Sequence, residues 1–241
     1  MRKTASSLTT VLALCGTAGL FLTPSVSSAA ASTPSVSSAS SASLASSALA
    51  ESPTTGWRQT SFTYSMQKPW NLSLSQRYTY SDSIHRMWVN DTDEPMSQGS
   101  GTDPRTEMRW QQEYTGGQHM WDADVYIPTG TNSASFMQIL RVKHPAGTPA
   151  TDIMFNAYSA NGGTVKAYDG TVLRTGVYNT WFNLKVEHNA STGTIRTYIN
   201  DTLVLTRADR GPATRHFKNG VYHHGTGRAE ARFRNIRYWT R

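Results

Sequence analysis

Hydrophobic and polar residues alternate along most of the chain from Trp57 onward. A period of two is typical of β-strands that bury one face and expose the other. In residues 105–111, Thr106, Met108 and Trp110 alternate with charged and amide side chains, which predicts a strand. The same alternation predicts strands over residues 83–89, 121–127, 136–142, 153–158, 181–187, 194–199, 202–206, 217–222 and 229–239.

Turn-forming residues separate these segments. Pro128 and Gly130 follow one predicted strand, Gly162 and Gly163 follow another, and residues 189–193 form a hairpin turn that ends at Gly193. No segment has a convincing amphipathic helical pattern. Many short strands with regular turns predict an all-β fold, a β-jelly roll in which two sheets form a sandwich with a concave substrate groove.

The first 55 residues have a different composition. Residues 1–31 combine the cations Arg2 and Lys3 with a short apolar run and small residues, which predicts a secretory signal peptide and an extracellular protein. Residues 32–55 consist mostly of Ser, Ala, Thr and Pro, which predicts a disordered linker. We expect residues 56–241 to form a single globular domain.

The charge and cysteine content narrow the possible functions. The only cysteine, Cys15, lies in the predicted signal peptide, so the mature chain has neither disulfides nor thiol chemistry. Cleavage lowers the net charge from +7 to +5, because Arg2 and Lys3 are lost and no acidic residue precedes Glu51. A basic secreted protein fits an anionic partner, and the absence of a Lys/Arg block argues against nucleic acid. We expect an acidic polysaccharide as partner, with no nucleic acid, no membrane contact and a monomeric state.

Two predicted strands carry cations and amides that suit an acidic ligand. Arg105 and Arg109 share a face opposite Met108 and Trp110, so this face lines either solvent or a groove. Arg109 can present a bidentate guanidinium to a carboxylate, whereas a solvent-facing ladder of ion pairs is the alternative. Gln138 lies in an otherwise apolar row and is either a substrate-binding amide or a hydrogen-bonded buried one.

Residues 216–225 are the most distinctive segment. If the segment is extended, Lys218, Gly220, Tyr222 and His224 share one face. A cation, a gap, a phenol and an imidazole suit a groove that binds an acidic ligand, and Gly220 is expected to leave room for a sugar ring. An edge strand with polar residues facing water is the alternative.

These segments together resemble the jelly-roll polyuronate lyases. Alginate lyases of that clan carry R-[ST]-E-[LM]-R, Q-[IV]-H and Y-F-K-[AV]-G-x-Y-N-Q, in this order. The chain has Arg-Thr-Glu-Met-Arg at residues 105–109, Gln-Ile-Leu at 138–140 and His-Phe-Lys-Asn-Gly-Val-Tyr-His-His at 216–224. Leu140 replaces the family histidine, and His223 and His224 replace Asn-Gln. The glucuronan lyases, a sister family on the same fold, are the more similar group because they depart from the alginate pattern in a similar way.

The resemblance implies cleavage of a polyuronate, of the β-1,4-polyglucuronate type, by β-elimination. Arg109 and Gln138 would neutralise the uronate carboxylate, and Tyr222 would transfer protons, its phenolate favoured by nearby cations. The missing imidazole at Leu140 is assigned to His85, with His224 as a competitor. Further substrate-binding residues are expected to be Arg105, Arg141, Lys218 and His224.

Other functions remain open at this point. An alginate lyase on the same scaffold and a non-catalytic module that binds acidic glycans are alternatives, because the fold does not dictate activity. A glycoside hydrolase needs two facing carboxylates, and no recognisable pair is present. The elimination requires no cofactor, although Asp91, Asp93 and Glu94 form either a structural calcium site or a solvated acidic loop.

Overall fold

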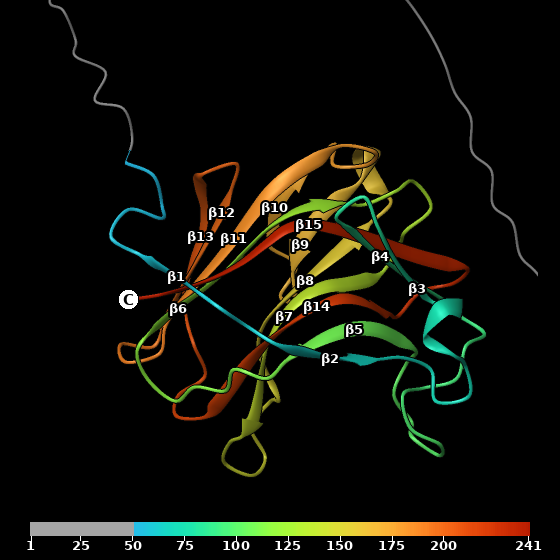
Figure 1. Ribbon diagram of the computed structural model, residues 1–241, viewed down its shortest axis with the longest axis horizontal. Coiled ribbons are helices and arrows are strands. Elements are labelled where there is room, and N and C mark those ends of the chain that lie inside the picture. Colours follow the sequence, from blue (N-terminus) through green and yellow to red (C-terminus); the bar gives the residue numbers. More distant parts are fainter. Residues whose placement is uncertain (1–50) are drawn as a thin grey trace, which may run out of the picture. The chain divides into compact units, whose positions relative to one another are not determined.

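The computed structural model describes residues 51–241 and consists of two stacked antiparallel sheets. In Figure 1, β15 and β4 of one sheet lie above β14 and β5 of the other. The prediction of an all-β jelly roll is confirmed. The predicted signal peptide and most of the predicted linker lie outside the described residues.

Each sheet is defined here by the order of its strands. Sheet A contains β13 (Thr202–Ala208), β12 (Thr194–Ile199), β11 (Trp181–Asn189), β6 (Gln118–Tyr126), β15 (Arg228–Thr240), β4 (Ile84–Asn90) and β3 (Tyr78–Ser81), and β1 (Arg58–Thr60) also pairs with β15. Sheet B contains β10 (Val172–Thr175), β9 (Thr164–Ala167), β8 (Thr151–Tyr158), β7 (Ala134–Lys143), β14 (Thr214–His223), β5 (Arg105–Trp110) and β2 (Tyr64–Gln67). Two 3₁₀ helices, η1 (Leu74–Gln76) and η2 (Ala160–Gly162), lie in the connections.

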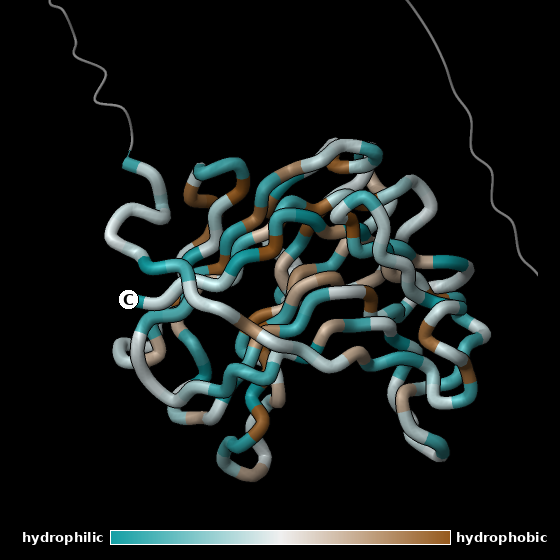
Figure 2. The backbone as a smooth tube through the Cα atoms, viewed as in Figure 1, coloured by the Kyte–Doolittle hydropathy of each residue, from teal (hydrophilic) through white to brown (hydrophobic). Residues whose placement is uncertain are grey.

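The core lies between the two sheets and follows the alternation of the sequence. Met87 and Val89 from sheet A and Met108 and Trp110 from sheet B are fully buried. Figure 2 shows hydrophobic and hydrophilic positions alternating along the strands. Because the inner face holds one set of alternate residues, the other set must lie on the outer faces, where the candidate site is found.

The period-two pattern located the long strands and missed the short ones. Every strand predicted from the alternation is present, within a few residues at either end. The strands β1, β2, β3, β9 and β10 have only three or four residues each. Such short segments contain too few alternations to distinguish a strand from a loop.

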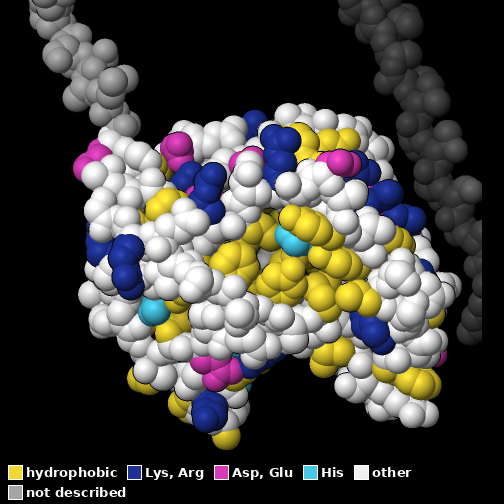
Figure 3. All heavy atoms as spheres, viewed as in Figure 1, with side chains coloured by type: hydrophobic (Ala, Val, Ile, Leu, Met, Phe, Trp, Pro, Cys, Tyr) yellow, Lys and Arg dark blue, Asp and Glu magenta, His cyan; other side chains and the backbone are white. Residues whose placement is uncertain are grey.

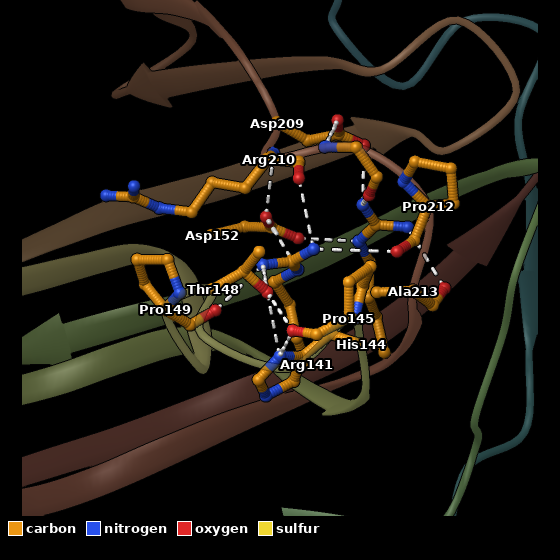
Figure 4. A network of polar contacts seen from close by, with 12 residues as sticks. Arg141, His144, Pro145, Thr148, Pro149, Asp152, Asp209, Arg210, Pro212 and Ala213 are labelled. Atoms are coloured by element: carbon orange, nitrogen blue, oxygen red, sulfur yellow. Dashed lines mark hydrogen bonds and ion pairs between the residues drawn. The ribbon is translucent and has the colours of Figure 1, made fainter.

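A charged network fills one end of the space between the sheets (Figure 4). Asp152 Oδ2 accepts a hydrogen bond from Arg215 Nε at 2.5 Å, and Asp152 Oδ1 lies 3.5 Å from Arg141 Nε. Arg215 Nη2 also donates to Asp209 Oδ2 at 2.7 Å, and all four side chains are buried. The expectation that Arg141 binds substrate is therefore wrong in its placement: Arg141 follows the inward-facing Ile139 by two residues and points between the sheets.

Gly220 permits a close approach of strands rather than room for a sugar. Its φ is 150°, and a Cβ at this position would lie 2.3 Å from the Thr106 carbonyl oxygen and 3.0 Å from Met87 Sδ. The direction of that Cβ is toward β5 and the core, so a side chain at Gly220 would not enter the outer face. The expectation of a gap for a sugar ring at Gly220 is therefore wrong. The glycine instead permits the backbone conformation of the bulge in β14.

In the acidic loop after β4, Asp93 forms an ion pair with Arg77. Arg77 Nε donates to Asp93 Oδ2 at 2.6 Å, and the backbone N–H of Asn90 donates to the same oxygen at 2.8 Å. Within residues 51–241, no three His, Cys, Asp or Glu side chains gather as a metal site would require. Asp93 thus faces Arg77, and a structural calcium ion in this loop stays a prediction. The same residues contain no helix long and apolar enough to cross a membrane.

Candidate active site

The three central strands of sheet B bring the three sequence motifs together. On β14, Lys218 pairs with Arg109 of β5 on one side and with Gln138 of β7 on the other. Tyr222 pairs with Arg105 of β5. Directly paired residues of antiparallel strands project to the same face, so these five side chains share the outer face of sheet B, as the sequence predicts.

Glu107 is the centre of this outer face. Its Oε1 accepts a hydrogen bond from Gln138 Nε2 at 2.7 Å, and its Oε2 accepts one from Lys218 Nζ. Arg105 Nη1 lies 3.8 Å from the same Oε2. Burial lowers the pKa of Lys218, an effect that Glu107 opposes. Because Gln138 and Lys218 are buried and bonded to Glu107, they form a support beneath the surface of the site.

Tyr222 lies at the surface of this support. The Arg105 guanidinium carbon is 4.0 Å from the centroid of the Tyr222 ring, and the His224 ring meets the phenol edge-on at 4.2 Å. His224 is itself held by Asp103 Oδ2 at 2.7 Å from its Nδ1 and by Ser135 Oγ at 3.2 Å from its Nε2. The half-buried phenol is thereby fixed between a cation and an imidazole, with its ring orientation defined.

Arg109 holds a carboxylate on the same face. Its Nη2 donates to Glu113 Oε1, and its Nη1 donates to the Trp110 carbonyl oxygen at 3.1 Å. The Glu113 side chain is about one-third exposed, so this is a solvent-accessible pair rather than a buried one. A ligand carboxylate that displaces Glu113 would find the guanidinium already oriented.

His85 does not belong to this group of residues. It lies on β4 of sheet A, where Tyr78 Oη is 2.9 Å from its Nδ1 and the Tyr80 ring stacks on it at 4.4 Å. Burial lowers the pKa of His85 to about 4. The expectation that His85 replaces the imidazole missing at Leu140 is wrong in its placement, because the two residues belong to different sheets. On the face viewed in Figure 3, hydrophobic side chains gather near the centre.

His216, which was not among the predicted site residues, pairs directly with Leu140 across β14 and β7. Its ring is buried, and neither of its nitrogens has a hydrogen-bond partner among the described residues. Burial, and then the charges of Arg109 and Lys218, lower its pKa to about 4. The available signal was the replacement of the first Tyr of the Y-F-K motif by His, two residues before Lys218 and thus on the same face.

Comparison with known proteins identifies the family. The sequence profile of the family described as "Alginate lyase" matches residues 55–239. The chain belongs to the alginate lyase family. It is accordingly a polysaccharide lyase that acts on uronates, as the three motifs on the outer face of sheet B indicate.

Solved structures of alginate lyases share the fold. The alginate lyase AlgAT5 of polysaccharide lyase family 7 superposes with a TM-score of 0.59 at 19% identity, over 73% of this chain and 93% of that one. The alginate lyase PA1167 of Pseudomonas aeruginosa gives a TM-score of 0.60 at 18% identity, over 74% and 98%. At these levels of sequence identity, the similarity to the two structures shows a shared fold alone.

A relative with higher identity has a different name. The citrate-binding protein of Hevea brasiliensis is 34% identical over 194 residues, which is 78% of this chain and 79% of that protein. Its name describes binding of a small carboxylate rather than cleavage of a polymer. One protein similar to this chain is thus named for ligand binding.

Proposed function

We propose that the protein is a secreted lyase that cleaves a glucuronan-type polyuronate by β-elimination. The observation that carries this proposal is the position of Tyr222 on the same outer face as Arg105, Arg109 and the supported Glu107. An extended acidic chain lying across these strands would meet the arginines of β5 and the phenol of β14. The glucuronan preference rests on the departures from the alginate motifs at Leu140, His223 and His224.

The chemistry follows from this arrangement. A base removes the proton on C5, the electron pair forms the C4–C5 double bond, and the C4–O bond breaks as its oxygen receives a proton. Arg109 neutralises the uronate carboxylate in the place that Glu113 takes, so the charge that develops at C5 is stabilised. Tyr222 transfers the protons, and the Arg105 guanidinium over its ring fixes the position of the phenol.

His216 supplies the imidazole in this proposal. Its ring is neutral at neutral pH and lies near Arg109 and Lys218, one strand away from the family position at Leu140, and within residues 51–241 its nitrogens have no hydrogen-bond partner. The ring is buried, so it would reach the uronate carboxylate, as a hydrogen-bond donor, only when the ligand displaces Glu113 from Arg109 beside it. Gln138 and Lys218 act through Glu107, which they hold in place, and are positioning residues.

The decisive experiment is incubation of the protein with a panel of polyuronates while the ultraviolet absorbance of the unsaturated product is followed. Glucuronan, alginate, pectate and hyaluronan form the panel. We expect the largest rate with glucuronan. A larger rate with alginate would reassign the substrate, and binding without absorbance change for every polymer would refute elimination.

A second candidate function is carboxylate binding without catalysis. It is favoured by the 34% identity to a citrate-binding protein and by the cationic outer face of sheet B. Under this candidate, citrate would displace Glu113 from Arg109, and no polyuronate would be cleaved. Titration with citrate, run beside the absorbance assay, separates the two candidates.

Replacing Arg109 by alanine is expected to lower kcat by about 10²- to 10³-fold while raising KM much less. The interaction strengthens as negative charge develops, so its loss affects the transition state more than the ground state. Steady-state kinetics on the preferred polymer provide the measurement. The matched control is Glu113→Gln, which frees Arg109 and should retain activity; a large rise in KM with unchanged kcat for Arg109→Ala would contradict this role.

Replacing His216 by leucine is expected to lower turnover by about 10²-fold or more, as removal of a hydrogen-bond donor to the developing negative charge does. The control His85→Leu should change turnover by only a few-fold, because His85 lies on the other sheet. Since the pKa of His216 is lowered to about 4, its protonation should reduce wild-type activity only as the pH approaches that value. An active His216→Leu enzyme together with an inactive His224→Leu enzyme would assign the imidazole to His224.

A further inference from the structure

Three arginines on the outer face of sheet A share one carboxylate. Arg228 and Arg232 flank Glu230 on β15, and Arg86 lies on β4 directly opposite Arg232. Glu230 Oε1 accepts from Arg86 Nε at 2.7 Å and from Arg232 Nε at 2.8 Å. Its Oε2 accepts from Arg86 Nη2 at 2.9 Å and from Arg228 Nη2 at 2.7 Å. We refer to Arg86, Arg228 and Arg232 as the arginine triad.

The charge of this cluster is unbalanced. The triad forms ion pairs with Glu230 alone among the described residues, which leaves two positive charges without a counter-charge. The Glu230 side chain is only 5% exposed, whereas those of Arg86, Arg228 and Arg232 are 43%, 45% and 32% exposed. Burial alone would raise the pKa of Glu230, but hydrogen bonds from the three arginines hold it below its usual value. Solvent, and any ligand, therefore meets the cations and not the anion.

Aromatic rings fix the guanidinium groups. The Cζ atoms of Arg86 and Arg228 lie 5.5 and 4.9 Å from the centroid of the Trp88 ring, and Arg232 Cζ lies 4.9 Å from that of Tyr126. Stacking and the bonds to Glu230 reduce the freedom that a long side chain loses on binding. The Nη1 atoms of all three arginines have no acceptor within residues 51–241 and are available to a ligand.

The triad lines an open hollow of about 410 Å³. Besides the triad and Glu230, its wall consists of uncharged residues, and Thr131 Oγ1 bonds the backbone of Glu230 and so fixes β15 there. The wall residues are Pro128, Thr129, Gly130, Thr131, Thr226 and Gly227. A carboxylate entering this hollow would meet several guanidinium donors and no second acid.

If these side chains only stabilised the sheet, three arginines around one glutamate would not be needed. Elsewhere on the same face, Arg196 pairs with the buried Glu187 at 2.9 Å in a one-to-one arrangement. Arg86 and Arg232 are instead directly opposite each other on neighbouring strands, a placement that is unfavourable for like charges. One carboxylate offsets only part of this repulsion, and a bound anion would offset the rest.

We propose that the arginine triad is a second binding site for the carboxylates of an acidic polysaccharide, on the sheet opposite the elimination site. A chain is favoured over a small anion because exposed arginines continue along β15. Arg234 and Arg237 have side chains 40% and 42% exposed, although each also lies near a carboxylate of β6, Asp124 at 3.2 Å and Asp122 at 3.6 Å. The choice of polymer rests on the proposed function, whereas the carboxylate site itself does not. Such a site would hold the enzyme on its substrate between cleavage events, as multivalent attachment does.

The test uses the full protein with Tyr222→Phe, so that the probe is not cleaved. Oligoglucuronates of defined length and, separately, citrate are titrated at low salt while the arginine Nε–H signals are followed by NMR. We expect the signals of the triad to shift with oligoglucuronate. The double variant Arg86→Gln/Arg228→Gln should weaken this binding by about tenfold or more, as expected for lost charge-assisted hydrogen bonds. The control Arg196→Gln removes one equally exposed arginine from the same face and should bind as before.

A second variant guards against misfolding of the double variant. Glu230→Gln keeps the shape of the side chain but removes the counter-charge that the described residues give the triad. The Tm should therefore fall, and oligoglucuronate should restore it more than it raises the Tm of the unsubstituted protein. Unchanged triad signals, or equal binding by the double variant, would overturn the proposal. Shifts with citrate but not with oligoglucuronate would overturn the assignment to a chain. Absence of elimination by the wild-type protein would refute the proposed function while leaving the triad result intact.

Discussion

Tyr222→Phe is expected to abolish most elimination activity while leaving the fold and most of the affinity for the polymer unchanged. A group that transfers a proton in the transition state contributes about 10²- to 10⁴-fold, and Tyr222 serves both the C5 proton and the leaving oxygen in the proposed mechanism. The substitution removes only the hydroxyl, so the ring remains beneath Arg105 at 4.0 Å and beside His224 at 4.2 Å. The loss should therefore appear in kcat.

The measurement is the initial rate of unsaturated product formation, together with the affinity for the uncleaved polymer. Tyr80→Phe is the matched control, because it removes a phenol hydroxyl from an exposed ring on the other sheet. A near wild-type rate for Tyr222→Phe would show that another group transfers the protons. Equal losses in both variants would indicate a general effect of phenol removal on the fold.

Asp152→Asn is expected to lower the free energy of unfolding by about 3–5 kcal/mol, the cost of breaking a buried ion pair on one side only. Asp152 is fully buried and is the carboxylate shared by Arg141 and Arg215, whose side chains are also buried (Figure 4). Removing its charge leaves two cations in the interior. Asp209 then offsets only one of them, through Arg215.

Equilibrium unfolding in denaturant gives the free energy directly. The control is Asp169→Asn, which breaks the ion pair with Arg207 at a site where the carboxylate is 50% exposed. A surface pair contributes only about 0–1 kcal/mol, so this variant should unfold almost as the wild type does. Similar stability of the two variants would contradict a structural role for the buried network.

The alternation of residues by itself determined the fold class and the composition of each strand face. Met108 and Trp110 had to point inward because they are large and apolar, so Arg105, Glu107 and Arg109 had to point outward. The same alternation placed Lys218 and Tyr222 on one face of β14. This information is local, since successive side chains of a strand always alternate.

The alternation of side chains along a strand does not reveal which strands are neighbours. His85 and His216 both looked like isolated histidines in the sequence, and only the pairing of β14 with β7 shows that His216 faces Leu140. His85 is on the other sheet because β4 pairs with β15. Strand order depends on packing between distant segments, which leaves no trace in the local pattern.

The tertiary structure also decided how each charge is used. Arg141 and Arg109 are both strand arginines, yet one is buried on Asp152 and the other holds a solvent-accessible carboxylate. The arginine triad forms because β4 and β15, about 140 residues apart, align Arg86 with Arg232. The sequence thus determined which side chains face outward, whereas sheet pairing determined which of them meet, because electrostatic contacts depend on distances that only the folded chain sets.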